Sequence, residues 1–186
     1  MSRVEFSQIS GAMALKVGRT YDERGFFEKI FNKSVFASYK LNTQIDSIAI
    51  SSNTRIGTLR GLHFQSPPFA EDKIVSCITG SIFDVVVDLR FDSPTFCKWA
   101  AVTLESDDEQ VLYLPAGVAH GFQTLEDNSS VLYGITSTYN PASAYSIRYS
   151  DLDLNISWPI PVGIVSRKDA EGLSLADAVN LFVDHR

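Results

Sequence analysis

The chain has 186 residues, 45% of them hydrophobic and 20% charged, which is an ordinary globular composition with enough apolar material for a core. Its formal charge of −6 excludes the broad basic field that nucleic-acid binding needs, so we expect no nucleic-acid partner. The opening MSRVEFSQISGAMAL lacks the apolar core of a signal peptide, and no run reaches transmembrane length. We therefore expect one cytoplasmic domain over residues 1–186, with no membrane partner.

The N-terminal part of the chain contains a turn and a short helical pattern. YDERGFF (21–27) is a charged turn, in which Arg24 taken alone is readily explained as a solvated side chain. The following FEKIFNKSVFASYK (27–40) predicts a short helix.

From residue 44 onward the dominant hydrophobic period is two. In IFDVVVDLR (82–90), Phe83 and Val85 fall on one face, whereas Asp84 and Asp88 fall on the other, where Asp84 could face either a pocket or solvent. Similar runs recur in QIDSIAIS, KWAAVTLE, QVLYLP, HGFQTL and SVLYGITS. Many short strands separated by turn signals, without helices between them, predict an all-β sandwich or barrel.

The segment GTLRGLHFQ (57–65) places a histidine in a predicted strand. By strict alternation His63 shares its face with Gly61 and Gln65, while Arg60 points the other way. This face is not apolar, so we expect it to be solvated or to face a ligand. If Arg60 serves the same pocket as His63, Gly61 must be a bulge that re-aims one of the two side chains.

Two further strand segments carry polar residues that have ordinary structural explanations. AEDKIVS (70–76) begins after a Pro-Pro loop and puts Lys73 at a strand start, where a lysine is usually solvated. VLYG (131–134) puts Tyr133 in an alternating strand, where a buried tyrosine most often belongs to the core. Neither residue alone indicates a site.

The two cysteines do not indicate a disulfide framework or a metal site. Cys77 and Cys97 lie in apolar-rich segments and lack the spacing of metal ligands. We expect both to be buried free thiols.

The segment LPAGVAHGF (114–122) contains Pro-x-Gly-x-x-His, which resembles half of the signature of cupins, a class of double-sheet barrels. In metal-binding cupins, a neighbouring strand supplies two more histidines and a carboxylate, but here that place offers only His63. Because transition-metal sites usually need three protein ligands, we expect no metal. The remaining histidine, His185, is next to last. For His63 and His120, the alternative is that each is a hydrogen-bonded core imidazole.

The C-terminal segment combines a helix-start signal with an amphipathic pattern. Ser166-Arg-Lys-Asp169 reads as a capping box, which is an ordinary structural role for Asp169. SLADAVNLF (174–182) then predicts a helix.

Taken together, several motifs make the chain resemble the dTDP-4-dehydrorhamnose 3,5-epimerase family of nucleotide-sugar enzymes. The motifs, in chain order, are YDERGFF, GTLRGLHFQ, EDKIVSCITGSIFDVVVDLRFDSPTF, LYLPAGVAHGF, VLYGITSTYNP, ISWP and SRKDA. The resemblance covers nearly the whole chain. It implies a cupin-type jelly roll with short peripheral helices and a C-terminal helix, working as a homodimer without a metal or organic cofactor.

The resemblance also assigns the chemical roles. It implies that His63 is the base, that Asp169 is its carboxylate partner and that Tyr133 is the acid on the opposite face of the sugar. Lys73 is implied as a further catalytic residue, and with His120 it matches pocket residues near the keto oxygen. Such chemistry needs a base with a pKa near working pH and donors for the developing oxyanion.

The implied substrate-binding residues are mostly polar. Arg24 and Arg60 match arginines that grip the diphosphate, for which bidentate guanidinium groups are well suited. In the family, the segment with Arg24 and Phe27 reaches in from the partner subunit. The other residues that we expect to bind substrate are His120, Gln65 and Asp84.

Some positions depart from the family pattern. They are Lys29 for a glutamate, Ile48 and Ile50 for a Gln-x-Asn pair, Gly134 and Thr138-Tyr139 for a lysine and a Tyr-Tyr pair, and Ala144-Tyr145 for Glu-Gly. These positions bear on recognition of the sugar and nucleotide, not on proton transfer, so they leave the carrier and the inverted carbons open.

The sequence therefore predicts an epimerase of a nucleoside-diphosphate 4-keto-6-deoxyhexose, which inverts C3, C5 or both through an enolate. Within the same family, the alternative is a single-centre epimerase or keto-isomerase on a carrier other than thymidine. Outside it, the alternatives are a non-catalytic cupin that binds a sugar nucleotide and a metal-dependent cupin, which the missing ligands oppose.

Overall fold

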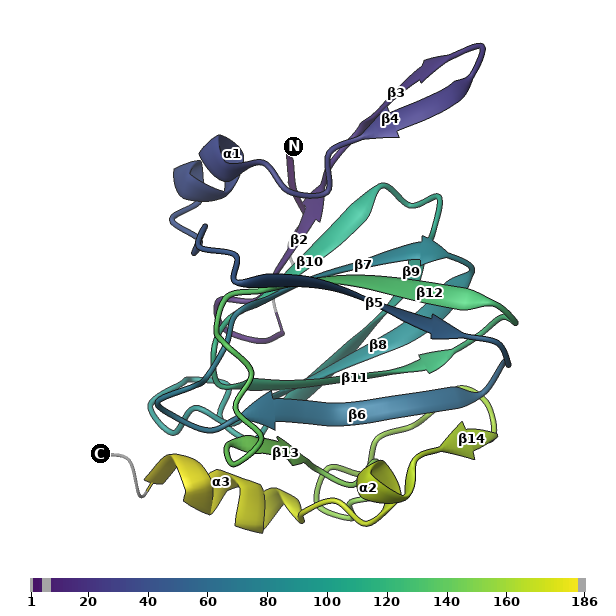
Figure 1. Cartoon of the computed structure of the whole chain (residues 1–186). Coiled ribbons are helices and arrows are strands. Elements are labelled where there is room, and N and C mark those ends of the chain that lie inside the picture. The colour runs from purple at the N-terminus through teal and green to yellow at the C-terminus, as the bar shows by residue number, and fades with distance from the viewer. Residues whose placement is uncertain (1, 5–7, 184–186) are drawn as a thin grey trace.

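The computed structural model describes residues 2–4 and 8–183, whose strands form two large sheets packed face to face (Figure 1). All strand pairs of the first sheet are antiparallel. In spatial order this sheet consists of β1 (Ser2–Val4), β2 (Met13–Lys16), β10 (Gln110–Leu114), β7 (Lys73–Thr79), β12 (Ser129–Ile135) and β5 (Ser47–Asn53).

The second sheet lies beneath the first in Figure 1 and contains the strand with His63. In spatial order it consists of β13 (Ala144–Ser146), β6 (Thr58–Gln65), β11 (Val118–Thr124), β8 (Ser81–Asp88) and β9 (Trp99–Glu105), with the short β14 (Ile164–Val165) parallel to β6. From β5 to β13 the chain passes repeatedly between the two sheets. The all-β cupin-type jelly roll predicted from the sequence is confirmed.

Strand β8 explains how the sandwich is filled. Its side chains Ile82 and Val86 point between the sheets, where they pack against residues of both. Its side chains Val85 and Val87 point to the opposite face and pack beneath the C-terminal segment. The strand is therefore buried on both faces, which is why its sequence is so rich in β-branched residues.

Short helices cover the outer faces of the two sheets. Near the N-terminus, α1 (Lys33–Ser38) is capped by the Asn32 side chain and packs Phe36 against the first sheet. Near the C-terminus, α2 (Arg167–Ala170) precedes α3 (Leu175–Val183), which covers the second sheet. Both predicted helices are thus present.

Further expectations concern the two cysteines, the third histidine and the membrane. Cys77 is a buried free thiol as expected, whereas Cys97, also free, is only half-buried. His185 lies outside the described residues. None of the helices in the described part of the chain is both long and apolar enough to span a membrane.

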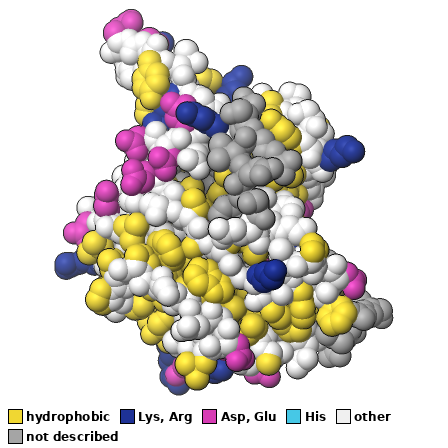
Figure 2. All heavy atoms as spheres, turned by 180° about the vertical axis from the view of Figure 1, so that it is seen from behind, with side chains coloured by type: hydrophobic (Ala, Val, Ile, Leu, Met, Phe, Trp, Pro, Cys, Tyr) yellow, Lys and Arg dark blue, Asp and Glu magenta, His cyan; other side chains and the backbone are white. Residues whose placement is uncertain are grey.

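A two-stranded hairpin projects from the sandwich, formed by β3 (Arg19–Asp22) and β4 (Gly25–Glu28) (Figure 1). Figure 2 shows hydrophobic side chains on this hairpin, where it stands clear of the body. Tyr21, Phe26 and Phe27 are all largely exposed there. Such an aromatic surface is unusual for an isolated hairpin, and it indicates a binding surface.

Candidate active site

A bulge in β6 brings Arg60 and His63 to the same side of the strand. Opposite β6, His120 of β11 pairs with His63 and Phe122 pairs with Arg60, so two residues of β6 face one residue of β11. Gly61 has a φ of +108°, and a Cβ there would lie 2.5 Å from the Cα of Gly121. The bulge that the sequence required is therefore present, and it depends on glycine.

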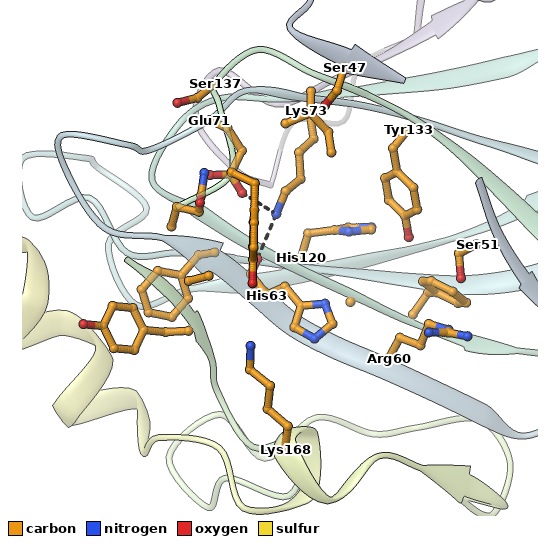
Figure 3. A pocket seen from close by; sticks show the side chains of 18 residues that line it. Ser47, Ser51, Arg60, His63, Glu71, Lys73, His120, Tyr133, Ser137 and Lys168 are labelled. Atoms are coloured by element: carbon orange, nitrogen blue, oxygen red, sulfur yellow. Dashed lines mark hydrogen bonds and ion pairs between the residues drawn. The ribbon is translucent and has the colours of Figure 1, made fainter. Parts of the chain in front are cut away.

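The two side chains line a cavity of about 360 Å³ between the sheets (Figure 3). The second sheet contributes His63 and His120, and the first contributes Lys73 and Tyr133. The remaining lining residues are Ser47, Ser51, Arg60, Phe64, Gln65, Glu71, Gly121, Phe122, Ile135, Ser137, Tyr139, Ala144, Tyr145 and Lys168. A cavity of this volume lies within the usual range for sites that bind small ligands.

His63 is held by a buried carboxylate while its ring stays accessible. Its Nε2 lies 2.7 Å from Oδ1 of Asp169, and its side chain is 45% exposed whereas that of Asp169 is 6% exposed. Ser146 Oγ and the Gly61 amide also donate to this carboxylate, at 3.1 and 3.4 Å. Because the carboxylate accepts a hydrogen bond from Nε2–H, the lone pair of the neutral ring lies on Nδ1.

The environment of Asp169 keeps the carboxyl charged. Burial tends to raise its pKa, but the hydrogen bond and charge of His63, with further hydrogen bonds, outweigh burial and hold the pKa below its ordinary value. The residue also lies in the first turn of α2, where Ser166 Oγ accepts from the Asp169 amide at 3.1 Å. The capping motif and the contact with the histidine are thus both present in one segment.

His120 forms a second imidazole–carboxylate pair, which is closed to solvent. Its Nε2 lies 2.7 Å from Oδ2 of Asp84, whose side chain is fully buried. Burial raises the pKa of Asp84, opposed by the charges of His120 and Lys73. Asp84 does not line the cavity. This carboxylate lies behind His120 and orients it, so the substrate-binding role expected of Asp84 stays a prediction and would act through His120.

Lys73 is buried, contrary to the solvated role that its position suggested. Its Nζ donates to the backbone oxygen of His63 at 2.9 Å and pairs with Oε1 of Glu71 at 3.1 Å. An ammonium group has three N–H donors, and these contacts use two of them. Nζ makes no further hydrogen bond among the described residues, and Figure 3 shows the Lys73 side chain pointing into the cavity.

Tyr133 lies on β12, across the cavity from β6. Its ring stacks edge-on against the His120 ring, with centroids 5.8 Å apart. Burial raises the pKa of the phenol, and the charge of Asp84 adds to this effect, opposed by Arg60. The residue borders the core but also lines the cavity, and its hydroxyl stays protonated.

Gln65 lines the cavity, but its amide is already committed to the backbone. Its Nε2 donates to the carbonyls of Phe69 and Thr138, and its Oε1 accepts from the Asn140 amide at 2.7 Å. The hydrogen bonds of this amide hold two loops in place, and the substrate-binding role expected of Gln65 stays a prediction. It contributes to the cavity wall as a scaffold residue.

The two arginines occupy different parts of the molecule. Arg60 is exposed at the cavity, and its Nε donates to Oδ1 of Asn53 at 2.6 Å. Arg24 lies in the hairpin turn, where it pairs with Asp22 and its side chain is 83% exposed. Arg24 and Phe27 do not line the cavity of their own chain.

Several lining residues were not anticipated from the sequence. Glu71 and Lys168 each lie within two positions of a predicted site residue, which is a signal that could have drawn attention to them. The serines at 47 and 51 share one face of β5, so alternation alone would have paired them. The departing residues Ile48 and Ile50 point to the outer face of that strand and are largely exposed.

Among the described residues, neither cavity histidine belongs to a cluster with metal-ligand distances. The grouping with such distances, Glu105, Asp107 and Asp108, lies outside the cavity. What the cavity offers is two oriented imidazoles, an ammonium group and a protonated phenol. This set of groups suits proton transfer at a carbon next to a carbonyl.

Comparisons with known proteins agree on one family. The family model described as dTDP-4-dehydrorhamnose 3,5-epimerase matches residues 7–177. The dTDP-4-dehydrorhamnose 3,5-epimerase of Escherichia coli K12 is 40% identical over 164 residues, covering 86% of this chain and 87% of that protein.

Solved structures support the same family. One is the dTDP-6-deoxy-D-glucose-3,5-epimerase of Legionella pneumophila in complex with dTDP-4-keto-L-rhamnose, with a TM-score of 0.88, 34% identity and coverage of 94% and 93% of the two chains. Another is a 3′-monoepimerase of Streptomyces bikiniensis in complex with dTDP-quinovose, with a TM-score of 0.85, 31% identity and coverage of 93% and 88%. The chain belongs to the dTDP-4-dehydrorhamnose 3,5-epimerase family and is an isomerase of the epimerase type.

Proposed function

We propose that the protein epimerises a thymidine-diphosphate-linked 4-keto-6-deoxyhexose at C3, C5 or both, by way of an enolate. The carrier and the keto sugar are those named for the related enzymes and for the ligand of the Legionella structure. The observation that carries the proposal is the contact between His63 and Asp169, which leaves a basic nitrogen accessible in the cavity.

His63 acts as the general base in this proposal. Its Nδ1 removes the proton from the carbon beside the ketone, and Asp169 holds the tautomer that makes Nδ1 the basic atom. The charged carboxylate also stabilises the imidazolium that forms. Proton abstraction by such a positioned group typically accelerates a reaction by about 100- to 10,000-fold.

Lys73 and His120 stabilise the enolate oxygen. The remaining N–H of the Lys73 ammonium donates to the C4 oxygen and brings a positive charge close to it. The His120 ring lines the same cavity. A donor at a developing oxyanion contributes on the order of 3 kcal/mol in a water-poor site. These side chains supply the base and the electrophile, so the proposal requires no cofactor.

Tyr133 returns the proton to the opposite face. It lies on the first sheet, whereas His63 lies on the second, so the two groups approach a ring between them from different sides. The raised pKa keeps the phenol protonated until the enolate forms. Delivery from this side inverts the carbon.

The nucleotide end of the ligand is bound by arginines of two subunits. Arg60 is exposed beside the cavity and suits the diphosphate. Arg24 and Phe27 are largely exposed on the hairpin of β3 and β4, which projects from the body (Figure 1). This supports a homodimer in which the hairpin completes the partner's site. The exposed Ile48 and Ile50 on the outer face of β5 give such a dimer an apolar contact surface.

The dimer is tested by mixing two inactive variants, His63→Ala and Arg24→Ala. If each site uses residues from both chains, subunit exchange creates hybrid dimers with one intact site and restores about a quarter of the activity. A mixture that stays inactive after demonstrated subunit exchange would contradict the shared site.

The reaction is tested by incubating the protein in D2O with 4-keto-6-deoxy sugars linked to thymidine, cytidine, guanosine and uridine diphosphates. We expect deuterium at C5 and C3 of the thymidine-linked sugar, read by NMR and mass spectrometry. Absence of exchange above a no-enzyme control with all four carriers would reject the proposal and favour a non-catalytic binding protein.

A second candidate is inversion of one centre alone. It is favoured by the similarity to a 3′-monoepimerase and by the departures at cavity residues Ala144 and Tyr145. Deuterium confined to one carbon would establish this version, and the same experiment therefore separates the two.

A further inference from the structure

Glu71 carries a buried carboxylate oxygen that no described group satisfies. The residue lies in the loop between β6 and β7, lines the cavity and is only 8% exposed. Its Oε1 pairs with Lys73 Nζ at 3.1 Å (Figure 3). Its buried Oε2 has no hydrogen-bond partner among the described residues. An unpaired buried carboxylate oxygen is strongly unfavourable unless a donor approaches it.

We propose that Oε2 of Glu71 accepts a hydrogen bond from the C3 hydroxyl of the substrate, which makes Glu71 a specificity-determining residue. This inference rests on the proposed function, in which Lys73 donates to the C4 oxygen. Because Glu71 and Lys73 are in direct contact, a sugar whose C4 oxygen meets Nζ places the substituents of C3 or C5 near Oε2. Of these two carbons, C3 carries a hydroxyl and C5 carries a methyl group.

The loop that holds Glu71 is fixed from both sides. On the outer side, the carboxylate of the neighbouring Asp72 accepts from Tyr113 Oη at 2.8 Å and from the Ala116 amide at 3.0 Å. On the inner side, Gln65 Nε2 donates to the Phe69 carbonyl at 3.0 Å. The acceptor is therefore positioned before a ligand arrives, which favours recognition of one hydroxyl over its absence.

A residue-by-substrate cycle tests this contact. The variants are Glu71→Ala and the isosteric Glu71→Gln, and the substrates are the thymidine-linked 4-keto-6-deoxyglucose and its 3-deoxy analogue. The readout is kcat/KM for deuterium exchange at C5, which both sugars can undergo. Circular dichroism and thermal melting establish that each variant is folded.

We expect Glu71→Ala to lower kcat/KM for the 3-hydroxy sugar by about 10- to 100-fold, mainly through KM, which is the usual range for a hydrogen bond to a charged group. With the 3-deoxy sugar, the variant should lose clearly less, because only the effect through Lys73 is common to both sugars. Glu71→Gln should show a smaller loss, again larger with the 3-hydroxy sugar than with the 3-deoxy sugar. The control is Glu126→Gln in the exposed turn between β11 and β12, which should not distinguish the two sugars.

An equal loss on both sugars would overturn the inference, because a residue that acts only through Lys73 cannot sense the C3 hydroxyl. If Glu71→Ala does not fold, equal losses for Glu71→Gln on the two sugars would overturn it in the same way. Failure of the wild type to exchange either sugar at C3 or at C5 would instead reject the proposed function, and this inference with it.

Discussion

Two imidazole–carboxylate pairs face each other across the β6–β11 ladder, and they differ in one respect. His63 and His120 are paired residues of these strands, and each uses Nε2 to contact a carboxylate at 2.7 Å. The His63 ring is nearly half exposed, whereas the pair of His120 and Asp84 is closed to solvent.

The difference in exposure suits the two imidazole–carboxylate pairs to different chemical roles. An imidazole that donates from Nε2 to a charged carboxylate and is open at Nδ1 can exchange protons, as a base must. A buried pair instead presents a fixed dipole or charge to the cavity, which suits oxyanion stabilisation. The opposite pKa shifts of the two carboxyl groups support this division of tasks, since the pKa of Asp169 is lowered whereas burial raises that of Asp84.

The largest effect on catalysis is expected from His63→Ala. Loss of the base should lower deuterium exchange at C5 by about 100- to 10,000-fold. The free energy of unfolding should change by only about 1 kcal/mol, because the ring is half exposed and Asp169 keeps its other donors. Exchange assays with denaturant titration measure both quantities, and residual exchange near the wild-type rate would refute the assignment of the base.

His120→Ala should destabilise the fold more than His63→Ala does. Removing the ring leaves Asp84 buried without its partner, so we expect a loss of about 3 kcal/mol of unfolding free energy. Denaturant midpoints of the two alanine variants provide the measurement. If His63→Ala proves the more destabilising change, the contrast between an open and a closed pair is wrong.

Asp169→Asn keeps the shape of the base's partner but removes its charge. The amide no longer enforces the tautomer with a basic Nδ1, so exchange should fall by about 100-fold or more. The protein should remain folded, since Asn can still accept from Ser146. Deuterium-exchange rates and thermal melting of the variant measure these two quantities.

Tyr133→Phe separates the two faces of the cavity. Net epimerisation should fall by about 10- to 100-fold, because the proton donor is lost, whereas exchange at the first carbon should fall less. The edge-on packing against His120 should survive in the variant. Product analysis by NMR, run beside the exchange assay, distinguishes this outcome from an equal loss of both activities.

The smallest effects concern pH and stability. Because the folded state lowers the pKa of Asp169, its contribution to stability is present above the ordinary aspartate range near 4 and is lost on acidification. The advantage of wild type over Asp169→Asn should therefore shrink at low pH. For Asp84, whose pKa is raised, the stability of wild type relative to Asp84→Asn should improve as pH falls. Parallel profiles for the two variants would contradict the opposite shifts.

The sheet architecture follows from local pattern. Alternation in residues 82–90 predicts two different faces, and β8 does place Val86 and Val85 in different cores. The same alternation could not place Asp84, because the period says which side a residue faces and not whether that side is solvent, cavity or core. Its burial depends on β11, whose His120 comes from a distant part of the sequence.

The site required more than local pattern. His63 and Asp169 are separated by 106 positions, so their pairing was available only through resemblance to a family. Lys73 appeared solvated because nothing local indicates that the preceding loop folds Glu71 back over it. Arg24 does not line the cavity of its own chain, so its proposed role rests on a second chain, about which the sequence of one chain carries little physical information.

The close backbone approach of Gly61 and Gly121 has an evolutionary consequence. Any side chain larger than hydrogen at either position collides with the neighbouring strand, so substitution of either glycine is disfavoured. Residues around the nucleotide and sugar can then diversify while the spacing between Arg60 and His63 stays constant. A protein whose site depends on two closely packed glycines can acquire new ligands without changing its reaction chemistry.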